Sequence, residues 1–232
     1  MKAWNVFYKQ FITYEGYKTV IQGLIATVEI AVLGLIIGIL IGTIIAVVKV
    51  VPKYKILPKI LEKICDVYVA FFRGTPMVVQ LLIGYFVLMP ALNIMIDGLY
   101  VAIIIFGLNS GAYVSEIMRS GIQSVDAGQL EAGRAVGLSF WTTMLKVVIP
   151  QSIKNILPTL GNEFIVLIKE TSVVSFIAVT DITKAFRSIG DANYEYIIPY
   201  LTLALVYLVM VLLITYLIKV IERRFKRSER TK

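Results

Sequence analysis

Long apolar runs separated by short polar stretches dominate this sequence of 232 residues. A helix that crosses a bilayer needs about 20 predominantly apolar residues. By that measure the chain predicts five spans, at about 20–50, 67–90, 98–118, 156–180 and 196–220. Glu163, Lys169 and Glu170 interrupt the fourth run, but neither half of it is long enough to cross alone. We therefore expect an all-α membrane protein in a single domain, residues 1–232.

Lysine and arginine residues set the expected orientation of these spans. Five spans place the two termini on opposite sides, and connections rich in Lys and Arg stay in the cytoplasm. Basic residues gather in the connections at 49–73 and 119–154 and in the tail after residue 218, and they are sparser elsewhere. The N-terminus is therefore expected outside, with the C-terminus and the segment 126–150 in the cytoplasm.

Composition excludes several classes of function. Hydrophobic residues make up 58% of the chain and charged residues 16%, whereas soluble domains carry about a quarter charged residues. The chain has no histidine and one cysteine, Cys65, which excludes histidine-based catalysis, histidine metal ligation and an internal disulfide. It also lacks a phosphate-binding loop of the form GxxxxGK[ST]. We expect no catalytic residues, metal site or nucleic-acid partner, and the net charge of +8 follows the membrane topology.

Two local patterns leave alternatives open. Gly34, Gly38, Gly42 and Ala46 recur on one face of the first span, where small residues let helices approach closely. The row predicts either packing within the chain or a contact between subunits. Aromatic residues recur through 4–17 at roughly helical spacing, which suits an amphipathic helix in the outer interface or an aromatic belt before the first span.

The cytoplasmic segment 126–150 is the most informative polar stretch of the chain. It contains Glu131-Ala132-Gly133, then Gly137, and it closes nine residues later with Val147-Val148-Ile149-Pro150. Glycine breaks or bends a helix, so the segment predicts two short helices hinged at Gly137. Such a knob beneath the membrane can enter a groove on a partner and transmit force.

This pattern resembles the EAA loop of bacterial ABC importer permeases, E-A-A-x-x-x-G-(nine residues)-I-x-L-P. The match departs mildly, with Gly133 for the second alanine, Val147 for isoleucine and Ile149 for leucine. Phe71–Pro76 with Gln80 is similar to the FRGTPxxxQ segment of polar amino acid permeases, and 161–172 is similar to their fourth-span segment. The resemblance covers about residues 18–225 and indicates the permease subunit of a polar amino acid ABC importer of the histidine, arginine and glutamine permease type.

The resemblance implies a set of partners. Coupling to ABC ATPase subunits falls to the loop residues Glu131, Ala132, Gly133, Gly137 and Pro150. The ATPase binds ATP and Mg, so this chain needs no cofactor of its own. A second permease subunit, identical or related, and a separate extracytoplasmic amino acid binding protein complete the importer. The chain would be a multi-pass protein of a bacterial or archaeal cell (inner) membrane, in contact with lipid.

Charged and amide side chains inside the spans are candidates for substrate contact. Charges in a bilayer are costly and normally face a cavity or a partner. Glu163 is expected near the midplane, where transporters bind substrate, and it could accept the ammonium or cationic side chain of an amino acid, with Asn162 bridging. Asn109 and Ser110 suit substrate contact or interhelical hydrogen bonding equally. This favours arginine, histidine or lysine as substrate; glutamine, glutamate or another polar amino acid is the alternative.

Other readings of the same residues remain. Glu163, Lys169 and Glu170 could couple protons or ions in a secondary transporter, or the chain could be a scaffold or channel-like subunit with no solute path. The EAA-like spacing argues against both, because neither needs a cytoplasmic knob. Residues 73–76 could form a simple turn at the cytoplasmic membrane surface or take part in gating. A salt bridge from Glu116 to Arg119 or another basic residue is also expected.

Overall fold

The structure is a computed structural model that describes residues 3–227, with side chains through residue 223. The described part is helical throughout and contains no strand. Its elements are α1 (Ala3–Phe7), η1 (Tyr8–Thr13), α2 (Gly16–Val50), α3 (Ile56–Gly74), α4 (Met77–Ile83), η2 (Gly84–Leu88), α5 (Met89–Ala91), α6 (Gly98–Gln123), α7 (Ala127–Ala135), α8 (Phe140–Thr143), η3 (Met144–Val148), α9 (Ile149–Glu170), η4 (Thr171–Ile177), α10 (Ile182–Asn193) and α11 (Ile197–Arg227). The π-helical turns are η1 to η3, and η4 is a 3₁₀ helix.

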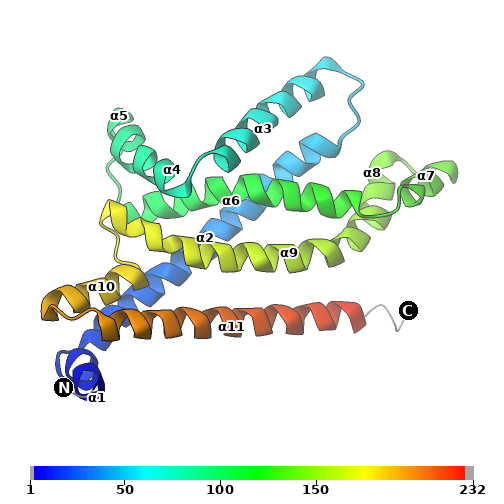
Figure 1. The fold of residues 1–232 in the computed structure, drawn as a ribbon. Coiled ribbons are helices and arrows are strands. Elements are labelled where there is room, and N and C mark those ends of the chain that lie inside the picture. The colour runs from blue at the N-terminus through cyan, green and yellow to red at the C-terminus, as the bar shows by residue number, and fades with distance from the viewer. Residues whose placement is uncertain (1–2, 228–232) are drawn as a thin grey trace.

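Three helices of the described part, α2, α6 and α11, are each long and apolar enough to cross a membrane. The pair formed by α3 and α4–α5 meets the same test only as one bent span. Helix α9 does not meet it, although it packs along α6 and α11 (Figure 1). It also begins before the expected boundary at 156 and gives way to η4 after Glu170. Five spans therefore stay a prediction, as does the orientation.

The row of small residues in α2 packs within the chain. A Cβ placed on Gly38 would lie 2.6 Å from the Ser110 hydroxyl oxygen, and one on Gly42 would lie 2.8 Å from the backbone nitrogen of Ser115. Both glycines therefore let α6 lie directly against α2, which confirms the first of the two alternatives. The core beside this contact includes the fully buried residues Ile30 and Phe106.

The N-terminal aromatic residues lie in α1, η1 and the start of α2, except Tyr14 in the turn between η1 and α2, and the choice between an interfacial helix and an aromatic belt stays open. Trp4 stacks on Phe7, Phe7 stacks on Phe11, and Phe11 packs against Phe186 of α10. Phe11 and Phe186 are both buried. This end of the chain is thus fixed to α10.

The second expected span, 67–90, is wrong as a single helix. Helices α3 and α4–α5 meet at a bend of 108°, and in Figure 1 they form a V whose apex meets the middle of α6. Proline has no N–H and disfavours helical geometry in the residue before it. Thr75, which precedes Pro76, is accordingly extended, with φ −120° and ψ 145°. Hydropathy alone could not show this, because residues 67–90 carry one charged residue, Arg73, and are apolar on both sides of the break.

Two buried amides satisfy the carbonyl groups that this break exposes. Gln80 Nε2 lies 2.8 Å from the Phe72 carbonyl oxygen and 3.0 Å from that of Thr75. Asn109 Nδ2 of α6 donates to Gln80 Oε1 at 2.8 Å, and it lies 3.3 Å from the Phe72 oxygen. Both amide residues are 4% exposed. We call Gln80 and Asn109 with these carbonyls the amide knot.

The amide knot corrects the expectation for residues 73–76. Asn109 lies near the middle of α6 (Gly98–Gln123), so the segment tied to it lies at that depth in the helix packing. This position argues against a simple turn at the membrane surface, and a role in gating stays a prediction. Asn109 itself makes interhelical hydrogen bonds, one of the two roles that the sequence allowed.

Replacing Gln80 by leucine tests the amide knot. Gln80→Leu leaves the Thr75 carbonyl without its side-chain donor and the Phe72 carbonyl with only the longer bond from Asn109, and a buried unsatisfied group costs about 1–3 kcal/mol. We expect a clear drop in the thermal unfolding midpoint of the purified chain in nanodiscs. Gln151→Leu is the matched control, because Gln151 makes one exposed hydrogen bond, to Gln129. Equal midpoints for the two variants would contradict the role of the knot.

Candidate functional site

The segment 126–150 folds into two short helices hinged at Gly137, as predicted. Asp126 caps α7 by accepting from the Gly128 N–H at 2.7 Å, and Ser139 caps α8 by accepting from the Thr142 N–H at 3.1 Å. Gly137 has φ +87°, a left-handed conformation that glycine adopts without strain. The Leu138 N–H then bonds back to the Gly133 carbonyl at 3.0 Å, which closes the end of α7.

The packing of this hairpin explains why the chain has Gly133 where the EAA motif has its second alanine. Gly133 is buried, and a Cβ on it would lie 2.3 Å from Thr143 Cγ2. Only glycine therefore lets α7 lie this close to α8. Met144 and Val148 are also buried, so the second half of the segment anchors the hairpin. The hairpin continues through η3 into α9, whose first turn contains Pro150.

The two remaining coupling candidates lie on the outside of the hairpin. Glu131 and Ala132 are exposed, and Glu131 and Arg134 line a groove of about 700 Å³. The opposite wall of the groove comes from the connection between α2 and α3, with Tyr54 92% exposed. This end of the molecule, which holds α7 and α8, lies far from α10 (Figure 1). The structure thus presents a polar and aromatic surface that a partner protein can contact.

Glu163 and Ser110 form a buried pair between α9 and α6. Glu163 is 9% exposed, and Ser110 Oγ donates to its Oε1 at 3.1 Å. No ion pair joins Glu163 to a basic group among the side chains of residues 3–223. A buried carboxylate without a cation is costly. The pair is therefore a candidate site for a cationic ligand group.

Of the other two substrate candidates, Asn109 lies apart from this pair and Asn162 lies beside it in the sequence. Asn109 belongs to the amide knot and faces the break in the second span rather than Glu163. Asn162 is exposed on α9, next to Glu163 in sequence. The structure thus brings Ser110 and Glu163 together and assigns Asn109 to helix packing.

Pro158 and Gly161 do not unwind α9. The helix runs from Ile149 to Glu170 with Pro158 inside. A Cβ on Gly161 would lie 2.8 Å from the side chain of Ile218. Gly161 therefore serves the close approach of α11, and the helix keeps its course.

A charged cluster between the C-terminal ends of α2 and α6 and the middle of α3 was only partly foreseen. Arg119 pairs with Glu116 at 2.7 Å, as expected for neighbours one helical turn apart. Lys49, 10% exposed, also lies 3.0 Å from Glu116 and 3.0 Å from Asp66 of α3. Sequence reasoning assigned Lys49 only to topology, because no local spacing connects it to residues on other helices.

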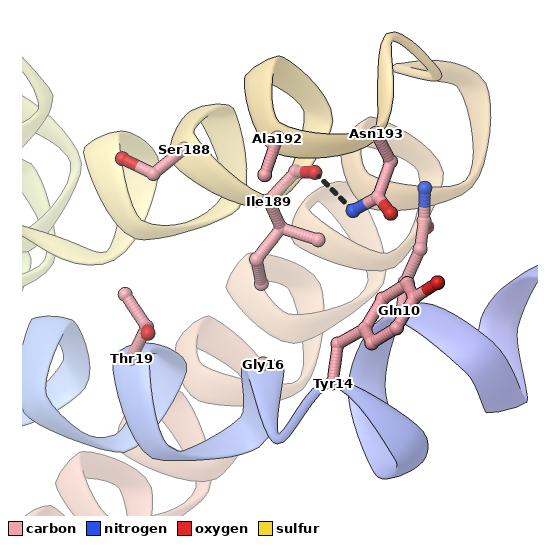
Figure 2. Close-up of a pocket in the computed structure, with 8 residues that line it drawn as sticks. All are labelled: Gln10, Tyr14, Gly16, Thr19, Ser188, Ile189, Ala192 and Asn193. Carbon is pink, nitrogen blue, oxygen red and sulfur yellow. Dashed lines mark hydrogen bonds between the residues drawn. The ribbon is translucent and has the colours of Figure 1, made fainter.

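A polar pocket of about 420 Å³ lies at the other end of the molecule, between the start of α2 and α10 (Figure 2). Gln10, Tyr14, Thr19, Ser188 and Asn193 contribute polar groups to it, and no charged side chain lines it. Asn193 Nδ2 donates to the Ile189 carbonyl at 2.8 Å. Gln10 Nε2 lies 3.1 Å from Glu195 Oε2. The first contact lies within α10, and the second joins the N-terminal segment to the connection between α10 and α11.

Known proteins similar to this chain are amino acid permeases. The family model described as "binding-protein-dependent transport system inner membrane component" matches residues 34–227. The arginine transport system permease protein ArtQ of Bacillus subtilis (strain 168) is 42% identical over 166 residues, 72% of this chain and 76% of that protein. The glutamine transport system permease protein GlnP of Escherichia coli (strain K12) is 37% identical over 161 residues, 69% and 74% of the two chains.

A solved structure agrees with the fold over nearly the whole chain. The crystal structure of an amino acid ABC transporter with histidines superposes with a TM-score of 0.83, at 40% identity, and covers 92% of this chain and 98% of that one. A chain of the MetNI methionine ABC transporter, at 18% identity, shares the fold with a TM-score of 0.77. The chain belongs to the binding-protein-dependent transport system inner membrane component family and is the permease of an amino acid ABC importer.

Proposed function

We propose that this permease forms the path for a basic amino acid, arginine, histidine or lysine, at a site that includes Glu163. The observation that carries the proposal is the buried Glu163 carboxylate, held by Ser110 and without a basic partner among residues 3–223. A ligand ammonium or guanidinium would supply the missing positive charge. Asn162 follows on the exposed side of α9 and would bridge to the same ligand.

The relatives' names support the amino acid class more broadly than the basic subclass. They include permeases named for arginine, glutamine and cystine. Glutamine or another polar amino acid is therefore the second candidate. Glu163 favours the cationic substrates, because an acidic group in a low-dielectric site discriminates strongly between charged and neutral side chains.

Separate ATPase subunits would drive the import by docking on the hairpin α7–α8. ATP and Mg would be bound there, and an extracytoplasmic binding protein would deliver the amino acid at the opposite face of the membrane. A second permease subunit, identical or related, would complete the path. The hairpin runs through η3 into α9, so a displacement at Glu131 or Gly137 can reach Glu163 along one chain segment. A bacterial or archaeal cell (inner) membrane is the proposed location, consistent with the family description.

Glu163→Gln tests the substrate class. The change keeps the shape and the capacity to bond Ser110 but removes the negative charge. We expect uptake of arginine to fall about 10- to 100-fold, the size of a lost charge-assisted hydrogen bond, with glutamine uptake much less affected. Glu29→Gln, which removes a half-buried carboxylate from α2, is the control and should change neither. An equal loss for arginine and glutamine would remove the preference for a basic substrate.

Gly137→Pro tests docking of the ATPase. Proline fixes φ near −65°, whereas Gly137 has φ +87°, so the hinge cannot keep its shape. We expect the variant to lose co-purification with the ATPase and amino-acid-stimulated hydrolysis. Gly137→Asn is the control, because asparagine tolerates a positive φ and an added Cβ meets no atom within 4 Å. Docking and stimulated hydrolysis retained in Gly137→Pro would contradict the assignment.

A further inference from the structure

Arg73 lies at the break in the second span, where no carboxylate pairs with it. It is in the last turn of α3, and its side chain is exposed. The guanidinium carbon lies 5.5 Å from the ring centre of Tyr113 on α6. No ion pair joins Arg73 to an acidic group among the side chains of residues 3–223. Its positive charge is therefore free to meet a ligand.

The amide knot fixes the depth of this charge. Phe72, which precedes Arg73, accepts from Asn109 through its carbonyl oxygen, and Asn109 lies near the middle of α6. Tyr113 follows Asn109 by one helical turn. An exposed guanidinium at that depth cannot face lipid without a high cost. The exposed side of Arg73 must therefore face a polar space, such as a solute path.

Adjacent residues of α6 hold Arg73 and Glu163 at the same level. Asn109 fixes the segment that carries Arg73, and Ser110 bonds Glu163. Because consecutive residues of a helix point about 100° apart, α6 holds a positive group and a negative group at similar depth on neighbouring faces. An amino acid carries an ammonium and a carboxylate on one carbon, and a guanidinium is suited to bind a carboxylate through two parallel hydrogen bonds.

We propose that Arg73 binds the α-carboxylate of the transported amino acid. The proposal rests on the proposed function, because it requires Glu163 to lie on the solute path. Glu163 would then bind the cationic group of the ligand, and Arg73 would bind the α-carboxylate, which all amino acids share. The pairing with Tyr113 orients the guanidinium and leaves its N–H groups available.

Direct binding to the permease–ATPase complex tests this assignment without the binding protein. The probes are labelled arginine and labelled argininamide, which differ only in the charge and shape of the carboxyl end. Arg73→Gln should weaken arginine binding about 10- to 100-fold and leave argininamide within about twofold. Arg73→Lys, which keeps the charge but not the planar fork, should fall between. The ratio of the two affinities is the readout, because a purely structural role would lower both together.

Control measurements distinguish a wrong carboxylate assignment from a wrong solute path. Arg187→Gln removes an arginine that is 67% exposed and near Asp191 on α10, and it should leave both affinities unchanged. Equal weakening of both probes by Arg73→Gln, or an unchanged preference for arginine, overturns the carboxylate assignment. Equal affinities of the unchanged complex for arginine and argininamide also overturn the carboxylate assignment, whereas binding of neither probe shows that the proposed path itself is wrong.

Discussion

A helix broken at bilayer depth leaves carbonyl groups that lipid cannot satisfy. In this permease the break follows Gly74, and the side chains of Gln80 and Asn109 supply the missing donors. Another buried polar contact is connected to these hydrogen bonds through α6. Because Asn109 belongs to α6, the break is tied to the same helix that presents Ser110 to Glu163. The FRGTPxxxQ segment thus contains the end of α3 and, in Gln80, the side chain that donates hydrogen bonds to the carbonyl groups exposed at that end.

The helices around α6 pack closely against one another through glycine residues. Gly38 and Gly42 bring α2 against it, and Gly161 brings α11 against α9. Such contacts leave little room for one helix to bend alone, since added atoms would overlap. A movement that starts at the hairpin α7–α8 would therefore displace α9 as a unit. This fits a transporter whose substrate residues are carried by rigid helices between two states.

The sequence could predict features set by the backbone properties of single residues, but not features set by contacts between different helices. The hairpin was foreseen because Gly137 and Pro150 mark bends by their own backbone properties. The docking role came from the resemblance rather than from the geometry. The bend between α3 and α4 was missed, since a hydropathy window averages over it. Asn109 could not be assigned to packing or substrate without knowing that Gln80 faces it. Lys49 was missed for the same reason, because its partners Asp66 and Glu116 come from other helices.

Import driven by ATP is the property that these features jointly serve. The most direct measurement is uptake of labelled arginine into proteoliposomes that contain the permease, its ATPase and its binding protein. ATP enclosed with the ATPase should give uptake against a gradient, and a non-hydrolysable analogue should give none. Vesicles with the permease alone and an imposed proton gradient should also take up none. Uptake of equal rate in those vesicles would contradict the account and identify an ion-coupled transporter instead.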